Sequence, residues 1–466
     1  MLSAAAFPVV TETKIATGME LNVSVSGGEQ VMISQSAAGI TVTQVGTPTF
    51  LSGDLNQDGL VNFGDLSDAV QIYGTAGPNV GWTNLVSVVQ DFGQSSPPAN
   101  VSTLYSGSFA EIAVTCINGN NQVALDSTVT DQAVMQAGSG NDILVAGAGS
   151  TTLYAGTGQD TLVAGSGNDT LVALGSSIDT LKGGSGIDSF WATGADKILN
   201  VSAAETALGA VHTITNGVLP GLMSPLSNVS GAVYTSFAAN PLFAAAGPTV
   251  LDIKQGQLGD CWYLSSLAAI AQTDPNQIRQ DVVELNDGTF LARFFNGSTP
   301  VYEHVDATLL TNNGGLVDAQ LGQGNSLWVP VMEKAFAAFR FSSDSYSTLN
   351  GGWMNEAYND LGITNANNFA WSSPTAMMQQ IQTQLNSGDA VTAGILTVPS
   401  GTPLIGNHAY TVVAVVTDTN GNLTGLELRN PWGTVGISGY ASNNGYVTVT
   451  AAQAFAAIAG TTAGLV

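Results

Sequence analysis

Three groups of residues, far apart in the sequence, carry the side chains needed for nucleophilic attack on a carbonyl. Cys261 supplies a thiol, which becomes a strong nucleophile at neutral pH when a helix N-terminus and a nearby imidazole stabilise its thiolate. His408 is the candidate general base and acid, and Asn430 is the carboxamide that would orient its ring without adding a charge. Gln255, together with the backbone N–H of Cys261, is the candidate donor to the oxyanion. These residue types predict hydrolysis of peptide bonds through a covalent intermediate.

Two predicted elements would position these side chains. A helix is predicted to begin at Cys261, because apolar residues follow at helical spacing. Its apolar positions are Leu264, Leu267, Ala268 and Ala271. The apolar run at 409–416 predicts a buried strand, which would hold His408 rigidly at its start. The glycines at 256 and 259 allow the segment before the thiol to turn tightly.

The same segments resemble a known family. The segments 255–267, 408–410 and 429–433 resemble the three active-site blocks of the calpain family of cysteine proteases. The segments 327–337 and 350–362 also follow the pattern of that family. The resemblance runs from about 240 to 450, which is about half of the chain.

The resemblance implies an α+β papain-like core in two halves. The first half would carry Cys261, and the second would carry His408 and Asn430. One departure is Asn407, because animal members of the family usually have Gly before this His. The alternative function is that of a non-enzymatic, calcium-dependent adhesion or scaffold protein with a degenerate protease domain. The reactivity of the Cys261 thiol would distinguish the two.

A second informative region precedes the protease segment. From about 137 the chain repeats with a period of nine residues, each repeat having a Gly-rich turn that usually ends in Asp. The repeats resemble the RTX calcium-binding repeats of secreted bacterial proteins, which implies a parallel β-roll whose turn aspartates bind Ca²⁺. The candidate ligands are Asp142, Asp160, Asp169, Asp179 and Asp188. The residues expected to fill the narrow core are Leu144, Leu153, Leu162, Leu171, Leu181 and Phe190.

The repeats depart from the full pattern in two ways. Ala or Leu replaces the first glycine of the turn in five repeats, and Thr151 stands where an Asp is expected. We therefore expect fewer or weaker calcium sites than in a full array. The alternative is a flexible Gly/Ser linker, but a linker has no reason to carry Leu every ninth residue.

A third calcium candidate lies upstream, in a loop whose oxygen-bearing residues follow EF-hand spacing. The candidate ligands are Asp54, Asn56, Asp58, Asn62, Asp65 and the backbone carbonyl of Leu60. The loop resembles half of a type I dockerin, which implies a cohesin-like docking partner. The segment 82–93 resembles a second dockerin helix without its acidic loop, which weakens the case for docking. The alternative is an Asx-rich surface loop.

The charge of the chain limits its partners. It has 9 Lys and Arg against 34 Asp and Glu, a net charge of -25, and no Lys or Arg from Ile15 to Leu181. Nucleic acid is therefore not an expected partner, because little could neutralise phosphate, whereas acidic turns without nearby cations call for a metal such as calcium. The expected substrate is a protein or peptide. Cys116 and Cys261 are expected to be free thiols, and no segment is long and apolar enough for a membrane span.

These features predict a multidomain chain: an α+β papain-like protease core that follows a parallel β-roll and a small dockerin-like helical unit. The predicted parts are a β-rich segment (1–50), the dockerin-like unit (51–95), the β-roll (103–200), a connector (201–238) and the protease domain (239–466). The expected location is bacterial, secreted or at the cell surface. The N-terminal residues make a poor signal peptide, so we expect either export by another route or a natural start that differs from Met1.

Overall fold

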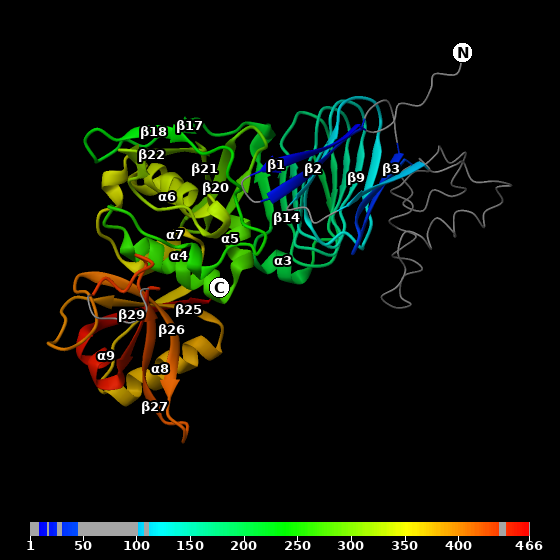
Figure 1. The fold of residues 1–466 in the computed structure, drawn as a ribbon. Coiled ribbons are helices and arrows are strands. Elements are labelled where there is room, and N and C mark those ends of the chain that lie inside the picture. Colours follow the sequence, from blue (N-terminus) through cyan, green and yellow to red (C-terminus); the bar gives the residue numbers. More distant parts are fainter. Residues whose placement is uncertain are drawn as a thin grey trace, which may run out of the picture. The chain divides into compact units, whose positions relative to one another are not determined.

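The computed structural model describes residues 9–15, 18–25, 30–44, 101–106, 111–437 and 444–465. The chain forms two compact units, Met1–Leu219 and Pro220–Val466. Each unit is described by itself, and Figure 1 labels its helices and strands.

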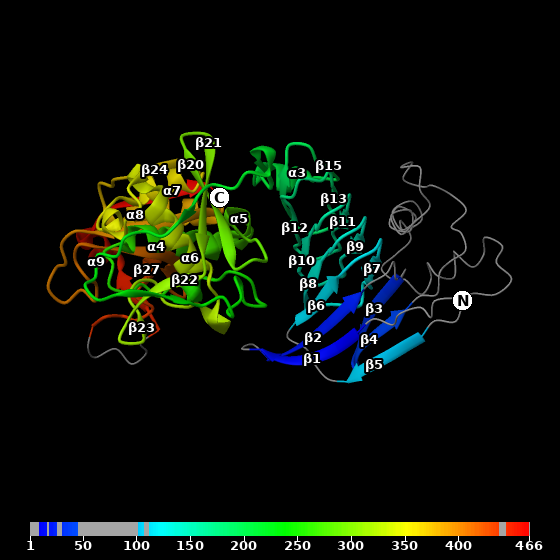
Figure 2. The ribbon, with the colours of Figure 1, turned by 90° about the horizontal axis from the view of Figure 1, so that it is seen from above.

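The first unit is a parallel β-roll with two sheets of eight strands each (Figure 2). One sheet has the order β1-β2-β6-β8-β10-β12-β14-β16. Its strands are β1 (Val9–Ile15), β2 (Gly18–Val25), β6 (Glu111–Cys116), β8 (Gln132–Gln136), β10 (Thr151–Tyr154), β12 (Thr170–Ala173), β14 (Ser189–Thr193) and β16 (Val211–Ile214). The other sheet has the order β15-β13-β11-β9-β7-β3-β4-β5. Its strands are β15 (Lys197–Leu199), β13 (Thr180–Lys182), β11 (Thr161–Val163), β9 (Ile143–Val145), β7 (Gln122–Leu125), β3 (Gln30–Ser36), β4 (Gly39–Gln44) and β5 (Val101–Ser106).

The repeat period explains how the roll closes. Successive repeats alternate between the two sheets, so residues two repeats apart pair in parallel, as Leu162 does with Leu144 and Leu181. All six predicted core residues, from Leu144 to Phe190, are fully buried, which confirms the predicted ladder. Each buried Leu contributes about 2 kcal/mol of transfer free energy. Glycine is required where turns stack: Gly158 has a φ of +133°, and a Cβ there would lie 1.9 Å from the Gly140 carbonyl oxygen.

The predicted N-terminal segment is continuous with the roll. β2 pairs in parallel with β6, and β3 pairs in parallel with β7, so the first strands extend both sheets. The dockerin-like unit (51–95), including its six candidate calcium ligands, lies outside the described residues.

The segment 201–238 was predicted as a connector, but the structure divides it between the two units. Its first part contains helix α3 (Ala203–Ala207) and β16, which pairs with β14 and extends the roll. Its second part contains β17 (Leu222–Met223) and β18 (Val233–Ser236), which join sheets of the second unit. Loop-forming prolines and glycines obscured these short strands in the sequence.

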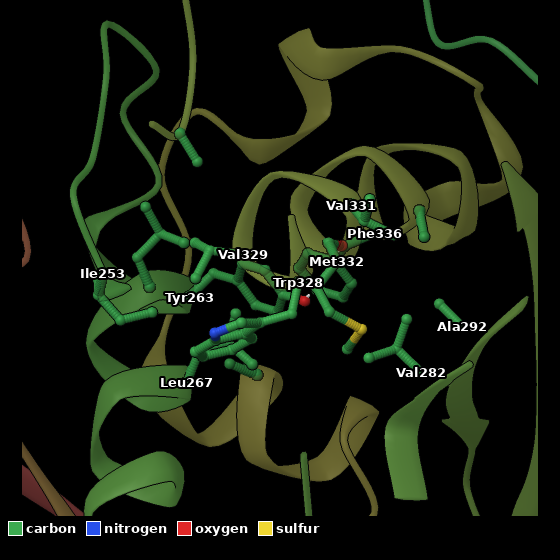
Figure 3. Packing of buried hydrophobic residues seen from close by; sticks show 14 of the residues in the cluster. Ile253, Tyr263, Leu267, Val282, Ala292, Trp328, Val329, Val331, Met332 and Phe336 are labelled. Atoms are coloured by element: carbon green, nitrogen blue, oxygen red, sulfur yellow. Dashed lines mark hydrogen bonds between the residues drawn. The ribbon is translucent and has the colours of Figure 1, made fainter. Parts of the chain in front are cut away.

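The second unit begins with a half built on helices and two small sheets (Figure 1). Its helices are α4 (Cys261–Thr273), α5 (Pro275–Asp281), α6 (Trp328–Phe339) and α7 (Met354–Asp360). Its sheets have the orders β17-β21-β20-β19 and β18-β22-β23, with β19 (Val282–Glu284), β20 (Thr289–Asn296), β21 (Thr299–Asp306), β22 (Thr308–Asn312) and β23 (Gly315–Leu316). The core lies between α4 and α6, where the rings of Tyr263 and Phe336 stack at 4.1 Å (Figure 3).

The rest of the second unit is a sheet of six strands in the order β24-β29-β25-β26-β27-β28. Its strands are β24 (Thr364–Phe369), β25 (Asp389–Ile395), β26 (His408–Thr417), β27 (Leu423–Arg429), β28 (Tyr446–Thr450) and β29 (Ile458–Leu465). Helices α8 (Pro374–Asn386) and α9 (Ala451–Ala457) pack with residues of this sheet in a separate core cluster. The unit therefore has the expected two halves, and both the predicted helix from Cys261 and the predicted strand from His408 are confirmed.

Two further expectations concern the described part of the chain. Both Cys116 and Cys261 are free thiols, as expected. Among the described residues, no helix has the length and apolarity that a membrane span requires.

Candidate active site

Cys261 is the first residue of α4, and Asp260 is the N-cap residue that precedes it. The thiol is largely buried, and this burial raises its pKa to about 11. The carboxylate of Asp260 raises the pKa further, whereas the backbone N–H of Ala409 lowers it. Although Cys261 begins a helix, burial and the Asp260 carboxylate favour the protonated form of its thiol.

His408 begins β26 and is buried beside Asn430. Its Nε2 atom lies 2.8 Å from Oδ1 of Asn430, which also accepts a hydrogen bond from the backbone N–H of Trp432 at 3.0 Å. The Trp432 ring lies against the imidazole, with centroids 4.7 Å apart. Burial lowers the pKa of His408, and the hydrogen bond that Nε2 donates to Asn430 Oδ1 opposes that shift. Because Nε2 is engaged, Nδ1 is the nitrogen left for proton exchange with a thiol.

Asn407, the departure from the family pattern, has a φ of +50°. This left-handed conformation suits Gly, and Asn tolerates it better than other side chains do. The substitution therefore keeps the turn that leads into His408.

Several hydrogen bonds join the two halves of the unit around the thiol. The backbone N–H of Gln255 donates to the Pro431 carbonyl at 2.8 Å, and Arg429 Nη2 donates to the Ile253 carbonyl at 2.9 Å. Further along α4, Thr411 Oγ1 donates to the Ser265 carbonyl at 2.8 Å. The segment before Cys261 is thus fixed to the segment that carries Asn430.

The side chain of Gln255 lies within its own loop. Its Nε2 atom donates to the Leu258 carbonyl at 2.6 Å, and its Oε1 atom is buried without a hydrogen-bond partner. One amide hydrogen is therefore committed to the Leu258 carbonyl, and the side-chain amide also lies within hydrogen-bonding reach of the Asp260 carboxylate, whose pKa it lowers.

The turn aspartates of the β-roll form two ladders, that is, two rows in which acidic residues one coil apart are joined by hydrogen bonds. In each ladder, one carboxylate oxygen accepts the backbone N–H of the residue one coil earlier, as Asp160 does from Asp142 at 2.8 Å and Asp188 does from Asp169 at 3.0 Å. The other oxygen accepts an N–H from the same turn, as Asp160 does from Gly156 at 2.9 Å. Burial raises the pKa of Asp179 to about 6 and that of Asp188 to about 7. The predicted ligands Asp142, Asp160, Asp169, Asp179 and Asp188 all belong to these ladders and are all buried.

Comparison with known proteins covers both regions of the chain. Residues 232–447 match the calpain family cysteine protease, and residues 136–171 and 175–199 match the RTX calcium-binding nonapeptide repeat. The chain contains a calpain-family protease domain preceded by RTX repeats.

The similar proteins include three calpains. The calpain-1 catalytic subunit of Rattus norvegicus is 32% identical over 228 residues, covering 46% of this chain and 31% of the calpain. The calpain-2 catalytic subunit of Homo sapiens is 31% identical over 227 residues, covering 45% and 32%. Calpain-8 of Rattus norvegicus is 32% identical over 229 residues, covering 45% and 32%. This chain thus spans about a third of the length of the curated relatives it matches.

The donor set of the RTX repeats fits calcium. All the side-chain donors are carboxylate oxygens, which suit a hard cation, and Oδ2 of Asp179 is buried without a hydrogen-bond partner. Among the described residues, no three acidic, His or Cys side chains are grouped so that they alone could hold a metal ion. Backbone carbonyl oxygens of the turns would therefore have to complete any site.

Two members of the ladders were missed in the sequence. Asp196 accepts the N–H of Asp179 at 2.8 Å, and Glu205 accepts the N–H of Asp188 at 2.7 Å. Each thus ends one ladder after the glycine-rich turns have stopped. The only signal for them in the sequence was an acidic residue at about the spacing of one coil.

Proposed function

We propose that this chain is a calcium-binding cysteine endopeptidase, in which Cys261 attacks the peptide carbonyl. The observation that carries the proposal is the bond between His408 Nε2 and Asn430 Oδ1, at 2.8 Å, next to the Ala409 N–H that acts on the thiol. Because this bond engages Nε2, Nδ1 is the ring nitrogen that would accept the proton of the Cys261 thiol.

The resting charges suggest how attack would proceed. The thiol is protonated and the pKa of His408 is lowered, so the neutral thiol and imidazole are the resting pair. Cys261 would pass its proton to Nδ1 of His408 as the sulfur bonds to the carbonyl carbon. The imidazolium would then protonate the leaving amine as the C–N bond breaks, and water would hydrolyse the resulting thioester.

The oxyanion formed during attack needs donors. The backbone N–H of Cys261 is one, and the side-chain amide of Gln255, which also lies within reach of Asp260, is the other. The bond from Gln255 to the Leu258 carbonyl supports this role, because it restricts the carboxamide to one place.

The RTX repeats supply the calcium dependence in this proposal. Calcium would neutralise the acidic turns and thereby stabilise the roll by linkage. Location outside the cell, or on its surface, follows as part of the proposal, since RTX repeats are typical of secreted bacterial proteins. Cohesin docking has no support beyond the loop at 54–65, which lies outside the described residues.

Cleavage of a casein-type substrate by wild type, Cys261→Ala and the matched control Cys116→Ala, each in EDTA and in excess calcium, tests the proposal. Activity in wild type and Cys116→Ala only is the expected result. If it also requires calcium, the metal sites are coupled to catalysis. Absence of Cys261-dependent cleavage by folded protein in both buffers would contradict the proposal.

A second candidate function is calcium-dependent adhesion or scaffolding without catalysis. The raised pKa of Cys261 favours it, because a thiol that stays protonated is a poor nucleophile. Native protein treated with iodoacetamide distinguishes the two functions. Faster alkylation of Cys261 than of the buried Cys116 supports the protease, whereas equally slow alkylation supports the scaffold.

A further inference from the structure

Three carboxyl groups are buried together beneath the N-terminal end of α4. Asp260 is the N-cap residue of α4, Glu333 lies on α6, and Asp318 lies in the segment after β23. Their residues are 0%, 1% and 5% exposed. Neither carboxylate oxygen of Asp260 or of Asp318 has a donor of good hydrogen-bond geometry, but the Gln255 side chain lies near enough to Asp260 to lower its pKa. Glu333 accepts the backbone N–H of Ala319 at 2.9 Å.

Such a cluster cannot be fully ionised. Asp260 and Glu333 lie within hydrogen-bonding reach of each other, and two carboxylates at that range repel each other strongly when water is excluded. A single proton between them turns the repulsion into a hydrogen bond. Glu333 is the better donor, because one of its oxygens can accept from Ala319 while the other carries the proton.

We propose that Glu333 is a protonated carboxyl group that donates a hydrogen bond to Asp260, and that this pair holds the Cys261 end of α4 in position. The two residues are positioning residues, since neither would touch the substrate. The consequence for catalysis rests on the proposed function of Cys261. The proton shared between Glu333 and Asp260 does not depend on that function.

The groups around the pair are consistent with this assignment. α4 contributes Tyr263 and the Cys261 thiol, the segment after β23 contributes Asp318, and Tyr346 faces Glu333. None of the groups that shift the pKa of Asp260 or Glu333 is a Lys or Arg in the described part of the chain. Burial raises the pKa of Asp260 to about 7 and that of Glu333 well above its usual range.

The pair also sets the charge beside the thiol. Ionised Asp260 raises the pKa of Cys261, so loss of its proton opposes formation of the thiolate. A hydrogen bond from protonated Glu333 stabilises the Asp260 carboxylate and so reduces its effect on the pKa of Cys261. The pair thus fixes the helix end while limiting the negative charge next to the nucleophile.

Two isosteric variants test the pair, read out by the rate of Cys261 alkylation with iodoacetamide against pH and by the melting temperature. Glu333→Gln should leave both unchanged, because the carboxamide N–H replaces the O–H and no charge is lost. Asp260→Asn should speed alkylation at alkaline pH by about three- to tenfold, which corresponds to a fall of up to about one unit in the pKa of the thiol. A merely structural role for Asp260 would not speed alkylation.

The matched control is Glu303→Gln, because burial also raises the pKa of Glu303 to about 7 although it lies outside the cluster. It should leave the alkylation profile in place. An infrared band of a protonated carboxyl group that disappears in Glu333→Gln would identify the proton directly. These readouts need no substrate. If they give the expected results but the protein cleaves nothing, the proposed carboxyl pair stands and the proposed protease activity is refuted.

Three outcomes would overturn the proposal. In the first, Glu333→Gln raises the melting temperature and speeds alkylation, as removal of a second negative charge beside Asp260 would do, which would mean that Glu333 is ionised in the native protein. In the second, Asp260→Asn alkylates no faster than wild type. In the third, added calcium abolishes the difference between Asp260→Asn and wild type, which would mean that a metal rather than a proton neutralises the cluster.

Discussion

Two replacements of Asn430 separate the effect of its side chain on the His408 imidazole from its effect on the stability of the fold. Asn430 is fully buried and makes three contacts: with His408 Nε2 at 2.8 Å, with the Trp432 N–H at 3.0 Å, and with the Val435 carbonyl at 3.4 Å. Asn430→Ala removes all three and leaves the Trp432 N–H without its acceptor. The expected loss of stability is about 2 kcal/mol, most of it from the unpaired backbone groups.

Asn430→Asp has nearly the same shape but adds a charge. A carboxylate beside the imidazole stabilises its protonated form, so the pKa of His408 should rise by about one unit or more. In wild type, burial lowers this pKa below its usual value of 6.5, and in the proposed mechanism neutral His408 is the form that accepts the proton. The acid side of the activity profile should therefore lie below pH 6.5 in wild type and move to higher pH in Asn430→Asp.

The assay is the pH dependence of kcat/KM, with the pH dependence of iodoacetamide labelling of Cys261 as a readout that needs no substrate. Urea unfolding of both variants measures the change in the free energy of unfolding. A profile that stays in place in Asn430→Asp, with the protein folded, would refute the contact between this side chain and the imidazole of His408. Equal stability of Asn430→Ala and wild type would refute the assigned hydrogen bonds.

Three other outcomes are expected. Asn407→Gly should keep activity, whereas Asn407→Ala should cost about 1 kcal/mol of stability because Ala disfavours the φ of +50°; thermal unfolding checks both, and equal melting points would contradict the reasoning. Leu162→Ala should destabilise the roll by about 3 kcal/mol, measured by urea unfolding, whereas truncation of the half-exposed Ile178 should change little. Asp179→Asn should weaken calcium binding in titration calorimetry, whereas Asp287→Asn, in the protease unit, should not; equal affinities would argue against the free Asp179 oxygen as a ligand.

Much of the candidate site was predictable from local sequence. The thiol at a helix start, the strand after His408 and the Leu ladder of the roll each follow from a short apolar period, because that period determines which face of an element is buried. The motifs also bring their own turns, as the left-handed residue before His408 shows.

The rest depended on contacts between distant segments. The short strands β17 and β18 form only because partners far along the chain accept their hydrogen bonds, and a segment rich in Pro and Gly gives no local sign of them. Asp196 and Glu205 join the ladders because the roll continues past its repeats and brings them one coil from Asp179 and Asp188.

The sequence by itself determined the residue types of the site, the elements that carry them and the calcium-binding character of the repeats. Only the tertiary structure decided what shifts their pKa values: burial raises the pKa of the Cys261 thiol, and the approach of α6 to α4 puts Glu333 against Asp260. The physical reason is that a period in the sequence specifies which side chains face inward, whereas a pKa depends on desolvation and on charges contributed by segments that meet only in the fold.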